Sequence, residues 1–266
     1  MRCLIPIFIG FFLVQSSLSA RQFLLEYGHQ VGESYKYEFK NRFRMRLITI
    51  EDVRSRDDVT EGNFFDSVED MNKEGQALIS RKFEIEEYEQ NGKELKLKDY
   101  EKTLVSEKFW FDPVLGVTAK PGIRTFEMND LMEMNLPMPG DRVEINEKWK
   151  HSYNFQLPTG KKEKIEVPGY FFVRAVKGST ARIVGLFKAK IPKDPITDYE
   201  GIVQFKTEFY FNLGKGIIES GTNNLVFKYE SRTELAKVFY KEARQQGSKE
   251  RLGYSMSFKS RYERED

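Results

Sequence analysis

The chain has 266 residues, of which 39% are hydrophobic, 14% aromatic and 32% charged. This composition excludes a disordered protein, which would have fewer aromatic residues, and an integral membrane protein, which would have fewer charges. Because 43 Lys and Arg residues are balanced by 41 Asp and Glu residues, the net charge is only +2, and no global field attracts nucleic acid. We expect one large or two small soluble domains, in which any electrostatic partner meets a local patch.

Residues 1–20 have the pattern of a secretory signal peptide. Arg2 precedes an apolar run from Cys3 to Val14, and a Ser-rich segment ends at Ala20. An apolar run of about a dozen residues is too short to span a bilayer, which needs roughly 20. We expect cleavage beside Ala20, which leaves no transmembrane segment; the alternative is an uncleaved interfacial anchor.

The chain contains one cysteine, Cys3, which would leave with the signal. Secreted eukaryotic domains usually carry disulfides, and the sequence also has no Asn-x-Ser/Thr glycosylation site. Both absences favour export in a bacterium, to the periplasm or another part of the cell envelope.

Alternation of apolar and polar residues, with a period of two, predicts strands over most of the chain. From Tyr35 to Thr49 most odd positions are apolar or aromatic, whereas the even positions from 36 to 46 are all charged. A hairpin is predicted at Asn91-Gly92, a pair typical of tight turns. Later strands are predicted over 104–111, 143–157, 165–176, 181–190, 200–211, 215–219, 224–230 and 254–262.

Other segments have different patterns. The acidic stretch from Glu51 to Glu74 indicates a solvated, mobile connection, and the spacing that begins at Asn63 indicates a short helix within it. Further helices are predicted over 125–136, before Pro137-Met138-Pro139-Gly140, and over 233–246.

These elements predict a mostly β fold, with long twisted antiparallel strands in a sheet pair or an open barrel and two or three short helices. We expect an N-terminal β half over 21–126, a helical and Pro-rich connection over 127–140, and a C-terminal β half over 141–266. The two halves resemble each other at three places in the same order, which suggests an internal duplication. These places are 31–39 and 145–153, the turns at Gly92 and Gly178, and 108–116 and 208–216. The alternative is that two meanders share the same alternation and turn residues.

No catalytic, metal or cofactor site is predicted. His29 and His151 lack the partner spacing of a zinc site, and the sequence has no nucleophile motif and no phosphate-binding glycine loop. The spacing of Asp57, Asp58 and Glu61 does not fit a calcium loop. Carboxylates are too numerous for a glycosidase to be excluded by counting, but the sequence favours a protein that is not an enzyme.

Two features are candidates for binding. Cations at alternate positions of the first strand would form a basic row on one face, suited to an anionic surface; the alternative is that acids of a neighbouring strand, such as Glu84, Glu86, Glu87 and Glu89, neutralise them. Two aromatic triplets, 109–111 and 209–211, are the second feature. Their middle residues, Trp110 and Tyr210, point to the opposite face of the sheet from the flanking phenylalanines. There they would contact a covering layer, a ligand cavity or a partner. The predicted binding residues are therefore Lys36, Lys40, Arg42, Arg44, Arg46, Trp110 and Tyr210.

An exported chain without cysteine after signal removal, rich in Lys, Glu and Phe, resembles exported spirochaete envelope proteins, among them periplasmic flagellar sheath proteins and surface adhesins. Its segment 136–149, with Pro139-Gly140-Asp141 and Trp149, also resembles uncharacterised β-rich bacterial envelope proteins. The resemblance implies a structural protein of a periplasmic assembly such as a flagellar sheath, which binds other envelope proteins or an anionic surface and no nucleic acid. The alternatives are a periplasmic carrier of a lipid or other apolar ligand and a surface adhesin.

Overall fold

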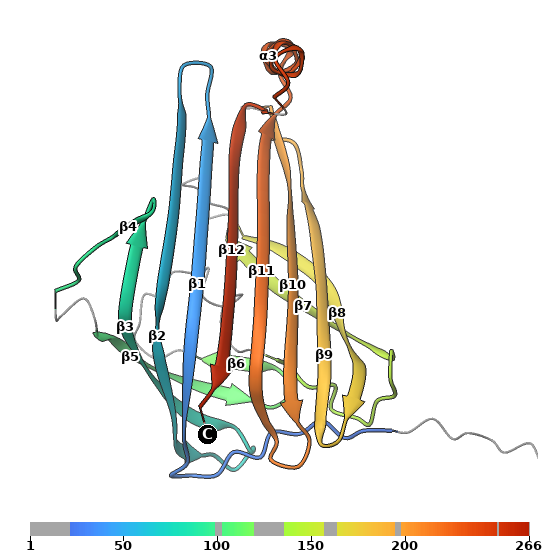
Figure 1. The fold of residues 1–266 in the computed structure, drawn as a ribbon. Coiled ribbons are helices and arrows are strands. Elements are labelled where there is room, and N and C mark those ends of the chain that lie inside the picture. Colours follow the sequence, from blue (N-terminus) through green and yellow to red (C-terminus); the bar gives the residue numbers. More distant parts are fainter. Residues whose placement is uncertain are drawn as a thin grey trace, which may run out of the picture.

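The computed structural model describes residues 22–98, 103–119, 136–156, 164–194, 198–248 and 250–265. The signal peptide predicted over 1–20 lies outside the described residues, as does the helix predicted over 125–136 apart from its last residue. Figure 1 shows long strands side by side, with a helix beyond one end of them.

The described strands form a single antiparallel sheet of 12 strands, in the order β6-β5-β3-β2-β1-β12-β11-β10-β9-β8-β7, with β4 paired to β3. The prediction of a mostly β, antiparallel fold is confirmed, and its form is one open sheet with β6 and β7 at the two ends of the path. The strand bounds are β1 Ser34–Ile48, β2 Val53–Met71, β3 Ala77–Gln90, β4 Lys93–Glu94, β5 Thr103–Asp112, β6 Gly116–Ala119, β7 Lys148–Gln156, β8 Lys164–Lys177, β9 Thr180–Ile191, β10 Tyr199–Asn212, β11 Ile217–Ser231 and β12 Gly253–Arg264.

The last strand joins two meanders. One meander runs from β1 to β6 and the other from β7 to β11, and β12 pairs with β1 on one side and with β11 on the other. Strands that are far apart in the sequence are therefore neighbours near the middle of the sheet. This arrangement brings the charged face of β1 beside the C-terminal half of the chain.

A turn in each meander supports the comparison of the two halves. The Asp112 carboxylate accepts hydrogen bonds from the backbone of residues 114 and 115 (both 2.8 Å), and the Asn212 side chain accepts the same bonds from residues 214 and 215 (2.9 and 3.0 Å). Each turn ends at a glycine with positive φ, Gly116 and Gly216. The hairpins at Gly92 and Gly178 follow strands in different places of the two meanders, so the duplication stays a prediction.

The sheet curls strongly toward its aromatic face. In a flat sheet, β7 and β11 would lie about 19 Å apart, four strand spacings, yet the rings of Phe155 and Phe227 on these strands are 5.6 Å apart. Tyr153 on β7 likewise contacts Phe205 on β10, at 5.6 Å. We call the face inside this curl the inner face and the opposite, convex one the outer face.

The inner face holds the hydrophobic core. Phe109, Phe111, Phe209 and Phe211 point inward and are buried. Tyr27, from the segment before β1, packs its ring edge-on against Phe111 and Phe211, at 4.7 and 5.6 Å. The first and third residues of both aromatic triplets therefore lie in the core.

The prediction for residues 51–74 was wrong. Most of this acidic stretch is strand β2, and the predicted helix that begins at Asn63 is part of it. Acidic residues are poor strand formers, but cations of neighbouring strands pair with them: Arg42 with Asp57 and Arg81 with Asp66. These cross-strand contacts, which the local sequence does not contain, compensate for the weak propensity.

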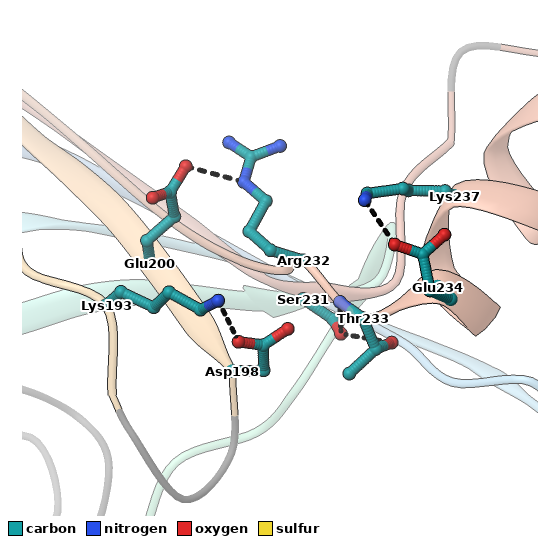
Figure 2. Close-up of polar contacts among 8 residues, drawn as sticks. All are labelled: Lys193, Asp198, Glu200, Ser231, Arg232, Thr233, Glu234 and Lys237. Atoms are coloured by element: carbon teal, nitrogen blue, oxygen red, sulfur yellow. Dashed lines mark hydrogen bonds and ion pairs between the residues drawn. The ribbon is translucent and has the colours of Figure 1, made fainter.

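The helix predicted over 233–246 is confirmed as α3, Glu234–Gln245, the only helix in the described ranges. The Thr233 hydroxyl caps it by accepting a hydrogen bond from the Ala236 amide at 3.2 Å. Figure 2 shows the polar contacts at its base, where Arg232 donates to Glu200 at 2.7 Å. In the described part of the chain, no helix is long and apolar enough to cross a membrane.

Candidate binding surface

The five cations predicted as a basic row do lie together on the outer face of β1. Their side chains alternate with the inward Tyr35, Tyr37 and Phe39, which are buried. The β1 cations are partly exposed to solvent and form a basic strip that only Glu38 interrupts. They are Lys36, Lys40, Arg42, Arg44 and Arg46.

Each β1 cation pairs with a carboxylate. Asp57 on β2 accepts two bonds from Arg42, at 2.8 and 2.6 Å, and one from Arg44 Nε at 3.0 Å. The hydrogen bonds from Arg42 lower the pKa of Asp57 below its ordinary value, with Arg44 adding to the shift and partial burial opposing it. The remaining pairs are Lys36–Glu265, Lys40–Glu61 and Arg46–Glu250.

Acids from β3 had been expected as the alternative source of these partners. None of Glu84, Glu86, Glu87 and Glu89 pairs with a β1 cation in the described contacts, because β2 lies between the two strands. Exposed ion pairs of this kind contribute about 0–1 kcal/mol each. The β1 row is therefore a partly neutralised strip rather than a free cationic surface.

A second set of cations lies next to this strip. These lysines alternate with buried inward residues of β9–β12, so they point from the outer face, and each is exposed. None of them forms an ion pair with a carboxylate of the described residues. We call them the lysine field: Lys188, Lys190, Lys206, Lys228 and Lys259.

The register of the sheet makes the strip and the field one surface. Lys259 on β12 lies opposite Arg42 on one side and Asn224 on the other, and Asn224 lies opposite Lys206 on β10. In this row Arg42 and Lys259 lie on adjacent strands, about 5 Å apart, whereas Lys259 and Lys206 lie two strands apart, about 10 Å. The two-strand separation limits repulsion between Lys259 and Lys206.

A groove of about 430 Å³ lies within this surface. It extends over β2, β1, β12 and β11, and two rows of outward side chains line it. Its middle is low because the β12 residues there are serines, whereas the flanking strands carry longer side chains. The outward residues that line the groove are Arg44, Arg46, Ser55, Asp57, Val226, Lys228, Ser255 and Ser257.

The other two predicted binding residues lie elsewhere on the outer face. Tyr210 on β10 is 39% exposed and donates its hydroxyl to Glu208 at 3.0 Å. Trp110 on β5 is half-buried and lies opposite Leu78 of β3. The structure does not bring either aromatic residue into the lysine field.

A buried polar cluster lies on the inner face. Arg81 makes two hydrogen bonds of 2.6 Å to Asp66, and its guanidinium lies over the rings of Phe64 and Phe109, at 4.8 and 5.2 Å. These two charged residues line a cavity of about 30 Å³ with His29, whose Nδ1 is buried without a hydrogen-bond partner. The cavity has room for water rather than for an organic ligand.

The histidines show no sign of a metal centre. Among the described residues, no cluster of His, Cys, Asp and Glu could hold a metal ion. His29 stacks on Tyr27 at 5.2 Å, and His151 points inward from β7 against Tyr153 at 4.7 Å. Burial lowers the pKa of both imidazoles, with Asp66 and Glu33 opposing the shift at His29.

Comparison with known proteins adds no family assignment. No model of a known protein family matches the chain, and no curated protein matches it.

The lysine field was missed in the sequence because its members are spread over four strands. Lys188 and Lys190 show the alternation locally, but the order β12-β11-β10-β9 beside β1 is needed to recognise one surface. A row on a single strand is visible in sequence, whereas a patch across strands depends on register.

Proposed function

We propose that this protein is a non-enzymatic, exported component of a bacterial cell envelope, and that it binds an anionic macromolecule through the outer face of β9–β12 and β1. One observation carries the proposal: none of the five lysines of the lysine field forms an ion pair with a carboxylate of the described residues. Unpaired cations gathered on one face of a nearly neutral chain attract polyanions and speed their association.

The resemblance in composition to spirochaete envelope proteins suggests the biological role in which this binding is used. A structural role in a periplasmic assembly such as a flagellar sheath needs a rigid body with an adhesive face. A long antiparallel sheet with a filled aromatic inner face supplies the rigid body, and the lysine field supplies the face. A carrier would instead need a large apolar cavity, and the cavity described on the inner face is about 30 Å³.

Charge reversal of four lysines tests the proposal. The variant Lys188→Glu, Lys206→Glu, Lys228→Glu and Lys259→Glu removes no member of the β1 ion pairs, whereas reversal of Arg42, Arg44 and Arg46 would. The control reverses four lysines that are also exposed: Lys73 in a turn, Lys93 and Lys96 in and after β4, and Lys177 at the end of β8. Both variants have the same net charge.

We expect the four-lysine variant to lose binding to a native envelope fraction by roughly 100-fold or more at low salt, because each reversal replaces attraction by repulsion. The control variant should bind within about threefold of the unmodified protein. Co-sedimentation with the envelope fraction measures both. Equal loss in the two variants would contradict a role for this face.

A further inference from the structure

The groove over β12 has the donors of an anion-binding site. Register places Ser255 and Ser257 between Arg44 and Arg46 on one side and Lys228 on the other. The two serine hydroxyls and the Lys228 ammonium make no hydrogen bond with the described residues. The groove therefore offers hydroxyl and ammonium donors that are not occupied within the protein.

Arginine adds donors with a fixed geometry. Arg44 contacts Asp57 through Nε alone, at 3.0 Å, so its terminal nitrogens have no partner in the described part of the chain. Among the described residues, Asp57 is the one carboxylate that lines the groove, and Arg42 already donates to both of its oxygens. A ligand that fits this set carries negative charge and accepts hydrogen bonds.

The curvature of the sheet favours a flexible chain as the partner. The cations extend from Arg44 on β1 to Lys190 on β9, around a face that curls enough to bring β7 against β11. A flat bilayer touches a convex face along a narrow line, so it meets only some of these cations. A linear polymer can follow the curve and meet all of them.

The residues between the cations argue against nucleic acid. Binding of single strands usually relies on aromatic side chains that stack on the bases. On the outer face of the described strands β9–β12 and β1, the one aromatic residue is Tyr210, which lies in the row of Arg182 and Glu263 rather than within the lysine field. The residues that separate the cations are small, amide-bearing or aliphatic: Ile202, Gln204, Asn224, Val226, Ser255 and Ser257.

We propose that the groove over β12 is a subsite for the acidic groups of a linear acidic polysaccharide, an inference that rests on the proposed function. The surrounding lysine field holds the polymer by charge, and the groove receives one acidic group between the arginines of β1 and Lys228. Serine hydroxyls on the groove floor donate to the same group.

The ligand side of the proposal is tested with defined polymers. Fluorescence anisotropy compares labelled polygalacturonate with its fully methyl-esterified form, which has the same backbone without the charge. Vesicles with 30% phosphatidylglycerol and an oligo(dT) strand serve as the lipid and nucleic-acid arms. We expect polygalacturonate to bind at least tenfold more tightly than each of the other three. Tighter binding of the vesicles or of oligo(dT), or equal binding of the esterified polymer, would overturn the inference.

The groove itself is tested without any change of charge. Ser257→Leu fills the groove, and Thr222→Leu places the same side chain on the outer face of β11, outside the groove. We expect Ser257→Leu to weaken polygalacturonate binding about tenfold and Thr222→Leu to change it less than twofold. Thermal melting checks that both variants fold. A second variant, Ser255→Ala with Ser257→Ala, should weaken binding by about threefold.

The two proposals fail in different ways. If reversal of the four lysines abolishes binding but Ser257→Leu matches Thr222→Leu, the outer face binds by its general field and the groove is not a subsite. If reversal of the four lysines has no effect on envelope binding, the proposed function itself is wrong.

Discussion

Among the described residues, Arg81 and Asp66 form the most deeply buried ion pair. Their side chains are 6% and 8% exposed, and two hydrogen bonds of 2.6 Å join them. Removing one member of a buried pair leaves the other charge without compensation, which usually costs about 3–5 kcal/mol. We expect Arg81→Met to lower the free energy of unfolding in urea by about 3 kcal/mol.

Two comparisons give this prediction its controls. Arg182→Met breaks a similar two-bond contact with Glu208, but this pair is far less buried, with side chains 45% and 18% exposed, so the loss should stay below about 1 kcal/mol. Replacing both buried partners, Arg81→Met with Asp66→Leu, should recover most of the loss. Equal losses for the Arg81 and Arg182 variants would show that the buried pair has no special weight.

The histidines predict a dependence of stability on pH. Burial lowers the pKa of His29 and His151 below the ordinary 6.5, so the unfolded chain binds protons first as the pH falls. Their contribution to stability is therefore complete above about pH 6.5 and is lost progressively below it. The variant His29→Gln with His151→Gln should show a flatter stability profile between about pH 7 and pH 5.5.

The same variant should bind as well as the unmodified protein, because neither histidine lies on the outer face. Chemical denaturation at several pH values measures the first effect and co-sedimentation the second. A folded variant that loses its activity in the native organism would require abandoning the non-enzymatic interpretation.

At the scale of one element, α3 has little support from the sheet. Its Ala236 is buried and its Phe239 half-buried, against Ile48 and Leu252, while Leu235 and Val238 are 56% and 53% exposed. Figure 1 shows the helix beyond the ends of the strands. Few buried contacts imply a low free energy of local unfolding.

The cap of α3 should therefore control its local stability. Thr233→Ala removes the hydrogen bond to the Ala236 amide, which costs about 1 kcal/mol, so amide exchange in α3 should speed up about fivefold. Thr233→Ser keeps the hydroxyl and should exchange like the unmodified protein. Faster exchange throughout β10–β12 would instead mean that the helix unfolds only with the sheet.

Single elements were predictable where their own sequence contained the signal. The period of two in β1, the Asn91-Gly92 turn and the capped α3 are local patterns, and each lies where it was predicted. Strand β2 was not predictable in this way, because its acidic residues are acceptable in a strand only beside Arg42 on β1 and Arg81 on β3. The local sequence of β2 does not show which cations of the neighbouring strands will pair with its acids.

At the scale of the whole molecule, the position of β12 decides the binding surface. The sequence predicts its alternation, but not that it lies between β1 and β11. Without that order, the β1 cations and Lys228 would lie on separate surfaces. The predicted row on β1 was therefore part of a larger surface whose unpaired charges lie on other strands.

Lysine footprinting tests the binding surface most directly, because it uses the unmodified protein with a native envelope fraction. An amine-reactive acetylating reagent labels exposed lysines, and mass spectrometry compares labelling with and without the fraction. We predict strong protection of Lys188, Lys190, Lys206, Lys228 and Lys259, and unchanged labelling of Lys73, Lys93, Lys96 and Lys177. Protection confined to the second group, or spread evenly over both, would contradict the assignment of the outer face as the binding surface.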